Sequence, residues 1–281
     1  MRVNIDRNLT IGLSILSLDD LKPHERTIPS LLRAIRNDMR RTGEQRDPIL
    51  VDEKTHVAMD GMHRIESLRS LGAKFAVCAE YDLHRDDIQL ERWLRTIIAP
   101  STKLIEVIIS KFEMKPCKSI QHAIGLVQTK EAGLALLSRR HSYFGGENLD
   151  IEDVYTKVAE IDALCEKNKI ELQFAGEHEK LRMFSSDSVY MLFPAHLSKS
   201  DVLRLAMANR LLPYKTTRYV VPIRPMGLYY PISFLSVRTL SECNHELERI
   251  VNLSKVVVKR KDSWYEGRKY SERVAIFRKS D

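Results

Sequence analysis

The chain has 281 residues, of which 43% are hydrophobic and 30% are charged, and its net charge is +7. These proportions are typical of a chain that buries a core, and they exclude an intrinsically disordered protein. No run approaches the roughly 18–20 apolar residues that a transmembrane helix needs, and the charged start from Met1 to Thr10 does not predict a signal peptide. The positive charge favours anionic partners such as nucleotides, phosphorylated metabolites or nucleic acid. The four cysteines form no CxxC pair, which predicts reduced thiols in a cytoplasmic protein without a zinc site.

The first hundred residues predict strands that alternate with helices. A helix that begins near Pro29 places apolar side chains on one face, and Gly43 is expected to end it. A second helix follows Gly61 and is expected to end at Gly72. Strands are expected at 11–18, 48–52, 57–59 and 75–81. This order of elements predicts an α/β fold.

The rest of the chain predicts more helices and then a return of strands. Helices are expected at 102–112, 120–137, 151–165, 200–211 and 240–253, and strands at 171–175, 189–193, 219–223 and 228–237. The segment around Trp93 is expected to form an amphipathic helix, and the basic end at 255–281 a solvated pair of strands. The pattern predicts three parts: an N-terminal lobe at 1–100, a helical connecting region at 101–168 and an α/β C-terminal lobe at 169–281.

The segment Asp60-Gly61-Met62-His63-Arg64 stands at a predicted strand–turn–helix junction. A glycine at the end of a strand allows a sharp turn. The helix that follows offers unpaired N–H groups and the positive end of its dipole, and His63 and Arg64 add further donors. The junction therefore predicts an anion site, suited to phosphate.

Several segments together resemble the ParB/sulfiredoxin superfamily, and in particular its free L-serine kinases. The later matches distinguish this resemblance from a likeness to a generic ParB-like domain. The matching residues are Pro23-His24-Glu25, Asp47-Pro48-Ile49, Asp60 to Arg64, Lys215 to Arg218, Pro222, Arg224-Pro225 and Trp264 to Arg268. The resemblance implies a ParB/sulfiredoxin-like N-terminal lobe packed against the α/β C-terminal lobe, with the active site in the cleft between them.

The resemblance also implies roles for some of these residues and for Trp93 and Tyr219. Glu25 would act as the general base that accepts the proton of the serine hydroxyl, with Asp60 and His63 as further catalytic residues. The implied nucleotide and phosphate contacts are Asp60, Gly61, Met62, His63, Arg64, Lys215 and Thr216. The implied substrate contacts are Trp93, Thr217, Arg218 and Tyr219.

Two positions depart from the family pattern. The family usually has histidine where Met62 and Tyr219 stand. The Met62 side chain cannot donate a hydrogen bond. Tyr219 keeps a polar tip but cannot become cationic near neutral pH.

The resemblance implies L-serine and an adenine nucleotide, ATP or ADP, as substrates, with Mg²⁺ as cofactor and ligands that the sequence does not identify. The product, O-phospho-L-serine, would enter cysteine or other amino-acid biosynthesis. Neither a membrane nor nucleic acid is an expected partner, and a monomer or weak dimer is expected.

Other interpretations of the same residues stay open. Glu25 could cap a helix, Asp60 could only form a turn, Lys215 to Arg218 could be a solvated loop, and Trp93 could be a core residue. The alternative function is a ParB-like DNA-binding protein controlled by a nucleotide. A sulfiredoxin-like reductase is excluded because Met62 stands where that chemistry needs cysteine.

Overall fold

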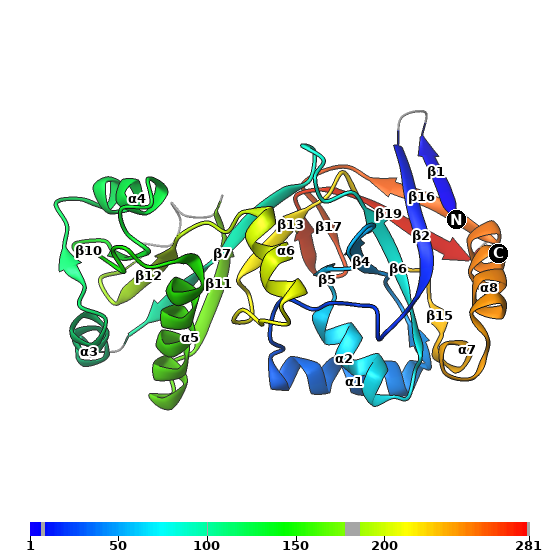
Figure 1. Cartoon of the computed structure of the whole chain (residues 1–281), viewed down its shortest axis with the longest axis horizontal. Coiled ribbons are helices and arrows are strands. Elements are labelled where there is room, and N and C mark those ends of the chain that lie inside the picture. Colours follow the sequence, from blue (N-terminus) through cyan, green and yellow to red (C-terminus); the bar gives the residue numbers. More distant parts are fainter. Residues whose placement is uncertain (7–8, 100, 178–185, 280–281) are drawn as a thin grey trace. The chain divides into compact units, whose positions relative to one another are not determined.

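The computed structural model describes residues 1–6, 9–99, 101–177 and 186–279 (Figure 1). The chain divides into two compact units. Unit 1 comprises residues 1–89, 202–211 and 219–281, and unit 2 comprises residues 90–201 and 212–218. Arg7 of the charged start and the last two residues of the basic end lie outside the described residues. None of the described helices is long and apolar enough to cross a membrane.

Unit 1 is built on a five-stranded sheet in the order β1-β2-β6-β4-β5. The strands are β1 (Arg2–Asp6), β2 (Leu9–Ser17), β4 (Ile49–Asp52), β5 (Ala58–Asp60) and β6 (Phe75–Tyr81). β4 and β6 are parallel, and the other neighbours are antiparallel. All four residues of β4 are buried, which explains why Ile49 to Val51 form a continuous apolar run rather than an alternating pattern.

Helices α1 (Pro29–Thr42) and α2 (Met62–Ser70) pack against each other in unit 1 (Figure 1). α1 begins with Pro29, whose fixed φ suits the first helical turn. It ends at Gly43, which adopts φ 71°, as expected for a left-handed C-cap. Both helices lie where the sequence predicted them.

The C-terminal segment of unit 1 adds three small sheets. Strands β14 (Ile223–Met226), β19 (Arg273–Lys279) and β16 (Ser254–Lys259) form one sheet, β3 (Glu44–Gln45) pairs with β15 (Tyr230–Pro231), and β17 (Ser263–Tyr265) pairs with β18 (Arg268–Tyr270). This segment also contains helices α7 (Ile232–Val237) and α8 (Leu240–Asn252). Helix α6 (Lys199–Met207) lies earlier in the chain and belongs to unit 1 from residue 202 onward. The strand predicted at 228–237 is wrong beyond Pro231, because α7 buries Ile232 and Leu235 on one helical face.

Unit 2 is built on a sheet in the order β11-β7-β12-β9-β10-β8, with β13 also paired to β7. The strands are β7 (Gln89–Ile98), β8 (Lys115–Pro116), β9 (Leu134–Ser138), β10 (Ser142–Gly145), β11 (Leu172–Gly176), β12 (Val189–Pro194) and β13 (Thr217–Val220). Its helices are α3 (Lys103–Lys111), α4 (Ile120–Gln128) and α5 (Ile151–Lys167).

Two predictions for unit 2 are corrected. Trp93 lies on strand β7 and not on a helix. The prediction was wrong because most of this strand is buried, so its sequence lacks the alternation that indicates a half-buried strand. The helix predicted at 120–137 ends at Gln128, and the apolar run that follows is the fully buried strand β9. A short apolar run does not distinguish a buried strand from a buried helix.

The boundaries of the two units differ from the three predicted parts. Residues 101–168 are not a helical connector, because β8, β9 and β10 belong to the sheet of unit 2. Residues 219–281 pack with the N-terminal segment rather than with 169–201. Long-range contacts fix this arrangement: β15 pairs with β3, and the Tyr81 hydroxyl donates a hydrogen bond to the Ile223 carbonyl oxygen.

Candidate active site

A tight turn joins β5 to α2 at Asp60 and Gly61. Gly61 adopts φ 111°, in the left-handed region that other residues rarely enter. A Cβ atom at this position would also lie 3.1 Å from the Arg64 guanidinium and 3.2 Å from Ile49 Cγ1. No described side chain caps this end of α2, where the helix dipole places partial positive charge. The turn is therefore suited to an anion such as phosphate.

Two arginines hold the Asp60 carboxylate. Arg224 on β14 donates to Asp60 Oδ2 at 2.5 Å and to Glu272 Oε1 at 2.6 Å, while Arg64 lies 3.5 Å from the same Asp60 oxygen. Burial by itself would raise the pKa of Asp60, but the charges of Arg224, Arg64 and Arg268 outweigh it and lower that pKa. Asp60 therefore stays ionised and keeps arginine side chains at the turn. No role was predicted from the sequence for Arg224 or Glu272.

The neighbours of Asp60 in the turn differ in what their side chains contact. Arg64 donates to the carbonyl oxygens of Pro48 at 2.7 Å and Asp47 at 3.2 Å, which ties the turn to the start of β4. Met62 is buried. Its thioether cannot donate a hydrogen bond, so only its backbone has a donor for phosphate.

Glu25 lies in an extended segment that pairs with the beginning of β5. Lys22 forms a bridge with Val57, and the His24 ring makes a 2.7 Å hydrogen bond to the Ala58 carbonyl oxygen through Nδ1. Because a carbonyl oxygen only accepts, Nδ1 carries the proton. The Nε2 atom faces Glu25 Oε1 at 3.7 Å, and both side chains are buried. A neutral histidine thus fixes the backbone beside the predicted base.

His63 fixes the other end of the same segment. Its Nε2 accepts a hydrogen bond of 2.9 Å from the N–H of Ile28, the residue before α1. The segment that carries Glu25 is therefore bound to β5 through His24 and to the first turn of α2 through His63. In this way the structure brings Glu25 together with the Asp60–Arg64 turn inside unit 1.

Tyr219 completes the surroundings of Glu25. Its ring contacts the His24 ring edge to face, with centroids 6.1 Å apart and planes at 89°. Its hydroxyl is buried and has no hydrogen-bond partner among the described residues. Burial raises the pKa of Tyr219, and the charges of Glu25 and Asp52 raise it further. The hydroxyl therefore stays protonated and remains a donor beside Glu25.

The buried His24 predicts a loss of stability in weakly acidic solution. Burial lowers the pKa of His24 from 6.5, against the smaller raising effects of Glu25, the Ala58 carbonyl and Asp60. As the pH falls below about 6.5, the unfolded chain binds a proton that the folded protein does not. The free energy of unfolding should then fall by up to about 1.4 kcal/mol per pH unit. Urea denaturation of the wild type and of His24→Gln between about pH 5 and 7.5 checks this. The variant should show the shallower slope, and equal slopes would rule out His24 as the cause.

Trp93, Lys215 and Arg218 form a second cluster, inside unit 2. Lys215 Nζ lies 4.9 Å and Arg218 Cζ 5.1 Å from the centre of a Trp93 ring. Arg218 Nε also lies 3.7 Å from Oε2 of the buried Glu91. Gly176 leaves room for this arginine, since a Cβ atom there would collide with the guanidinium. Two cations that contact one aromatic side chain can bind a carboxylate or phosphate group.

The backbone of the loop that carries Lys215 and Arg218 is held by hydrogen bonds from a buried arginine. Lys215 adopts φ 55°, uncommon for a residue with a side chain, and Thr216 and Thr217 are buried. The buried Arg95 donates to the carbonyl oxygens of Tyr214 at 3.0 Å and Lys215 at 3.4 Å. The role of Arg95 was not predicted from the sequence, because nothing near it in the chain indicates these contacts. The predicted contacts of the loop with phosphate and serine stay predictions.

The described residues contain no group of three or more His, Cys, Asp or Glu side chains that could hold a metal ion. Mg²⁺ commonly binds through one or two carboxylates, water and the phosphates of a substrate. The described residues therefore fit a Mg²⁺ ion that would be held mainly by the nucleotide, rather than by a cage of protein side chains.

Comparison with known proteins gives a consistent result. No protein-family model matches the chain. An ATP-dependent L-serine kinase of Staphylothermus marinus is 24% identical over 235 residues, which cover 79% of this chain and 90% of that protein. An ADP-dependent L-serine kinase of Thermococcus kodakarensis is 26% identical over 216 residues, which cover 75% of this chain and 87% of that protein. A solved structure of a free serine kinase with AMP, carrying a glutamate-to-glutamine substitution, matches with a TM-score of 0.69 at 23% identity, over 79% of this chain and 93% of that one.

These findings confirm the predicted resemblance to the free L-serine kinases and the mixed α/β fold that it implied. The resemblance extends over most of the chain and is not limited to the short motifs.

Proposed function

We propose that this protein is an L-serine kinase, which transfers a phosphoryl group from ATP or ADP to the serine hydroxyl and forms O-phospho-L-serine. The observation that carries the proposal is the position of Glu25: a buried carboxylate whose backbone is fixed to both sides of the Asp60–Arg64 turn. A base beside an anion site is what phosphoryl transfer to an alcohol requires. The two curated relatives with this activity support the choice of substrate.

In this proposal Glu25 accepts the hydroxyl proton while the serine oxygen attacks the terminal phosphorus of the nucleotide. The first turn of α2 stabilises the negative charge of the transferred group through its N–H groups and dipole. Asp60 acts by holding Arg224 and Arg64 at the turn, and His63 acts by fixing the segment that carries Glu25. Mg²⁺ bound with the nucleotide would neutralise phosphate charge.

The cellular setting is part of the proposal. All four cysteines are free thiols, which is usual in a reducing compartment such as the cytoplasm. We place the enzyme there, with a product that supplies cysteine or other amino-acid biosynthesis.

Phosphorus NMR tests the reaction directly. Purified protein is incubated with Mg²⁺ and L-serine, together with ATP in one sample and ADP in another. A phosphoserine signal in one sample identifies both the reaction and the donor. If folded protein gives no phosphoserine in either sample, the kinase proposal fails, and a DNA-binding titration with CTP would test the ParB-like alternative.

Tyr219→Phe separates a substrate contact from a structural role. The Tyr219 hydroxyl is buried without a described partner, so its removal should leave stability unchanged or raise it by about 1 kcal/mol. If the hydroxyl donates to bound serine, the same variant should raise the KM for serine about tenfold. Urea denaturation and initial rates on the same preparation check both expectations. An unchanged KM, or a large loss of stability, would contradict the substrate contact.

A further inference from the structure

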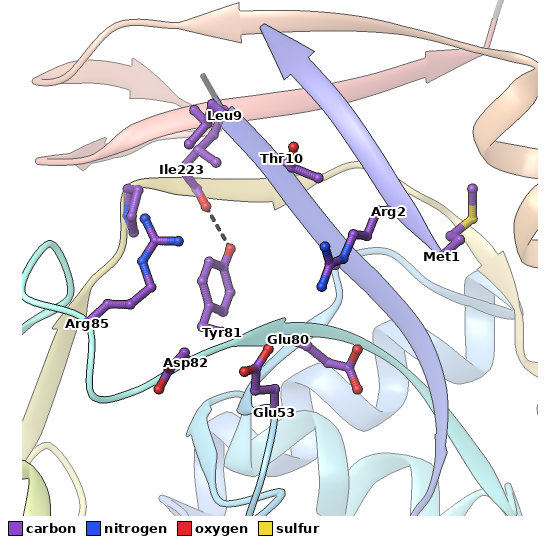
Figure 2. A pocket seen from close by; sticks show the side chains of 12 residues that line it. Met1, Arg2, Leu9, Thr10, Glu53, Glu80, Tyr81, Asp82, Arg85 and Ile223 are labelled. Atoms are coloured by element: carbon purple, nitrogen blue, oxygen red, sulfur yellow. Dashed lines mark hydrogen bonds between the residues drawn. The ribbon is translucent and has the colours of Figure 1, made fainter. Parts of the chain in front are cut away.

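A pocket of about 530 Å³ opens in unit 1 at the edge of the five-stranded sheet (Figure 2). β1 contributes Arg2 to its lining, the turn after β4 contributes Glu53, and β6 contributes Glu80 and Tyr81. Ile223 at the start of β14 closes another side. None of these residues belongs to the Asp60–Arg64 turn or to the Glu25 segment. The volume lies in the range of small-molecule sites.

The pocket presents both signs of charge. Among the described residues, Arg2, Glu53 and Glu80 have no ion-pair partner within 4.0 Å. The other charged side chains of the lining are paired: Arg85 lies 2.6 Å from Asp87, and Asp82 lies 3.7 Å from Lys54. Figure 2 shows Arg2 reaching in from β1, while the Glu53 and Glu80 carboxylates lie on the side of β6.

These charges select the chemistry of a ligand. Two carboxylates without a partner favour an ammonium group and disfavour the phosphates of a nucleotide. The Arg2 guanidinium, which has no ion-pair partner among the described residues, favours one carboxylate. The buried Tyr81 and Ile223 add apolar surface to the lining. We propose that this pocket is a second binding site, which takes a free α-amino acid with an apolar side chain.

The wall of the pocket also connects it to the candidate active site within unit 1. The Tyr81 hydroxyl donates a 2.6 Å hydrogen bond to the Ile223 carbonyl oxygen. The next residue, Arg224, binds Asp60 and Glu272. A ligand that packs on Tyr81 and Ile223 therefore restricts the strand that positions Arg224. This coupling rests on the proposed function, whereas the binding site itself does not.

Calorimetric titration of the whole protein with three matched probes tests the site. L-leucine carries both charged groups, isoamylamine lacks the carboxylate, and 4-methylpentanoate lacks the ammonium group. Leucine should bind at least tenfold more tightly than either analogue, and Glu80→Gln should weaken leucine binding at least tenfold. Glu248→Gln, an exposed change on α8, is the matched control and should bind leucine as the wild type does.

Several results would overturn the proposal. Absence of leucine binding up to millimolar concentration would do so, as would equal binding of isoamylamine, which would indicate a simple cation site. Unchanged leucine binding in both Glu80→Gln and Arg2→Gln would place the ligand elsewhere. Because the readout is heat of binding, failure of the kinase assay would leave this result intact.

The coupling has a test of its own. Leucine should change the affinity for the nucleotide about fivefold in the wild type. Tyr81→Phe, which keeps the ring but loses the hydrogen bond to Ile223, should still bind leucine and lose most of that change. An unchanged nucleotide affinity in the wild type would refute the coupling.

Discussion

Glu25→Gln is expected to lower kcat for phosphoryl transfer to L-serine by about 10²–10⁴-fold, the contribution that a positioned general base makes. The amide keeps the shape of the side chain but does not take up the hydroxyl proton. Nucleotide affinity should change little, because the turn at Gly61 does not depend on the Glu25 carboxylate. Initial rates with phosphorus NMR, together with calorimetric titration of the nucleotide, measure the two quantities separately.

The control distinguishes a lost base from a damaged fold. Glu248→Gln makes the same chemical change at an exposed position of α8 and should keep the wild-type rate. Urea denaturation should show that Glu25→Gln is folded at the assay temperature. A folded Glu25→Gln protein with the wild-type kcat would remove Glu25 as the base.

The local parts of this site could be predicted from the sequence. The order strand, Asp60, Gly61, helix is contained in a dozen residues, and glycine at a sharp turn has a direct steric cause. The helix from Pro29 to Gly43 was predicted for the same reason, since its start and stop signals are next to it in the chain.

The long-range contacts that hold the site in place could not be predicted in the same way. Arg224 and Asp60 are separated by 164 residues, and no local pattern relates them. The roles of His24 and His63 depend on which backbone group each ring meets, Ala58 or Ile28, and only the fold decides this. Trp93 was placed on a helix because a strand buried on both faces has no alternation to reveal it.

The return of the C-terminal segment to unit 1 has a similar cause. Strand pairing between Tyr230 and Gln45 links segments far apart in the sequence. Composition changes little between them, so the sequence offered no signal for the boundary at 219. Residues 169–281 were predicted to form one lobe because they are consecutive in the chain. In the structure, strand pairing places 219–281 in unit 1 with the N-terminal segment.

Arg224→Met is expected to lower the free energy of unfolding by about 3–5 kcal/mol, the cost of leaving a buried ion pair without one partner. Arg224 is 6% exposed and Glu272 is 3% exposed, and the guanidinium binds both Glu272 and Asp60. The variant leaves two carboxylates without their main counter-charge. The double variant Arg224→Met, Glu272→Gln should recover part of the loss, because it removes one of those charges.

An exposed ion pair in the same unit gives the matched control. Arg238 lies 3.3 Å from Glu242 on the surface, so Arg238→Met should cost only about 0.3–0.5 kcal/mol. Urea denaturation at about pH 7 measures the variants on one scale. A loss for Arg224→Met no larger than the loss for Arg238→Met would contradict the structural role of Arg224.

The dependence of this loss on pH tests whether the charge of Arg224 is responsible for it. Burial would raise the pKa of Asp60, but Arg224 and the neighbouring arginines lower it, so the ionised form stabilises the fold above the unfolded pKa of 3.8. That contribution is lost progressively as the pH falls below about 4, because the unfolded chain then binds a proton at Asp60 that the folded protein does not. The difference in unfolding free energy between wild type and Arg224→Met should therefore shrink between about pH 5 and pH 2. A difference that stays constant over this range would mean that the Arg224 side chain acts through packing and not through its charge.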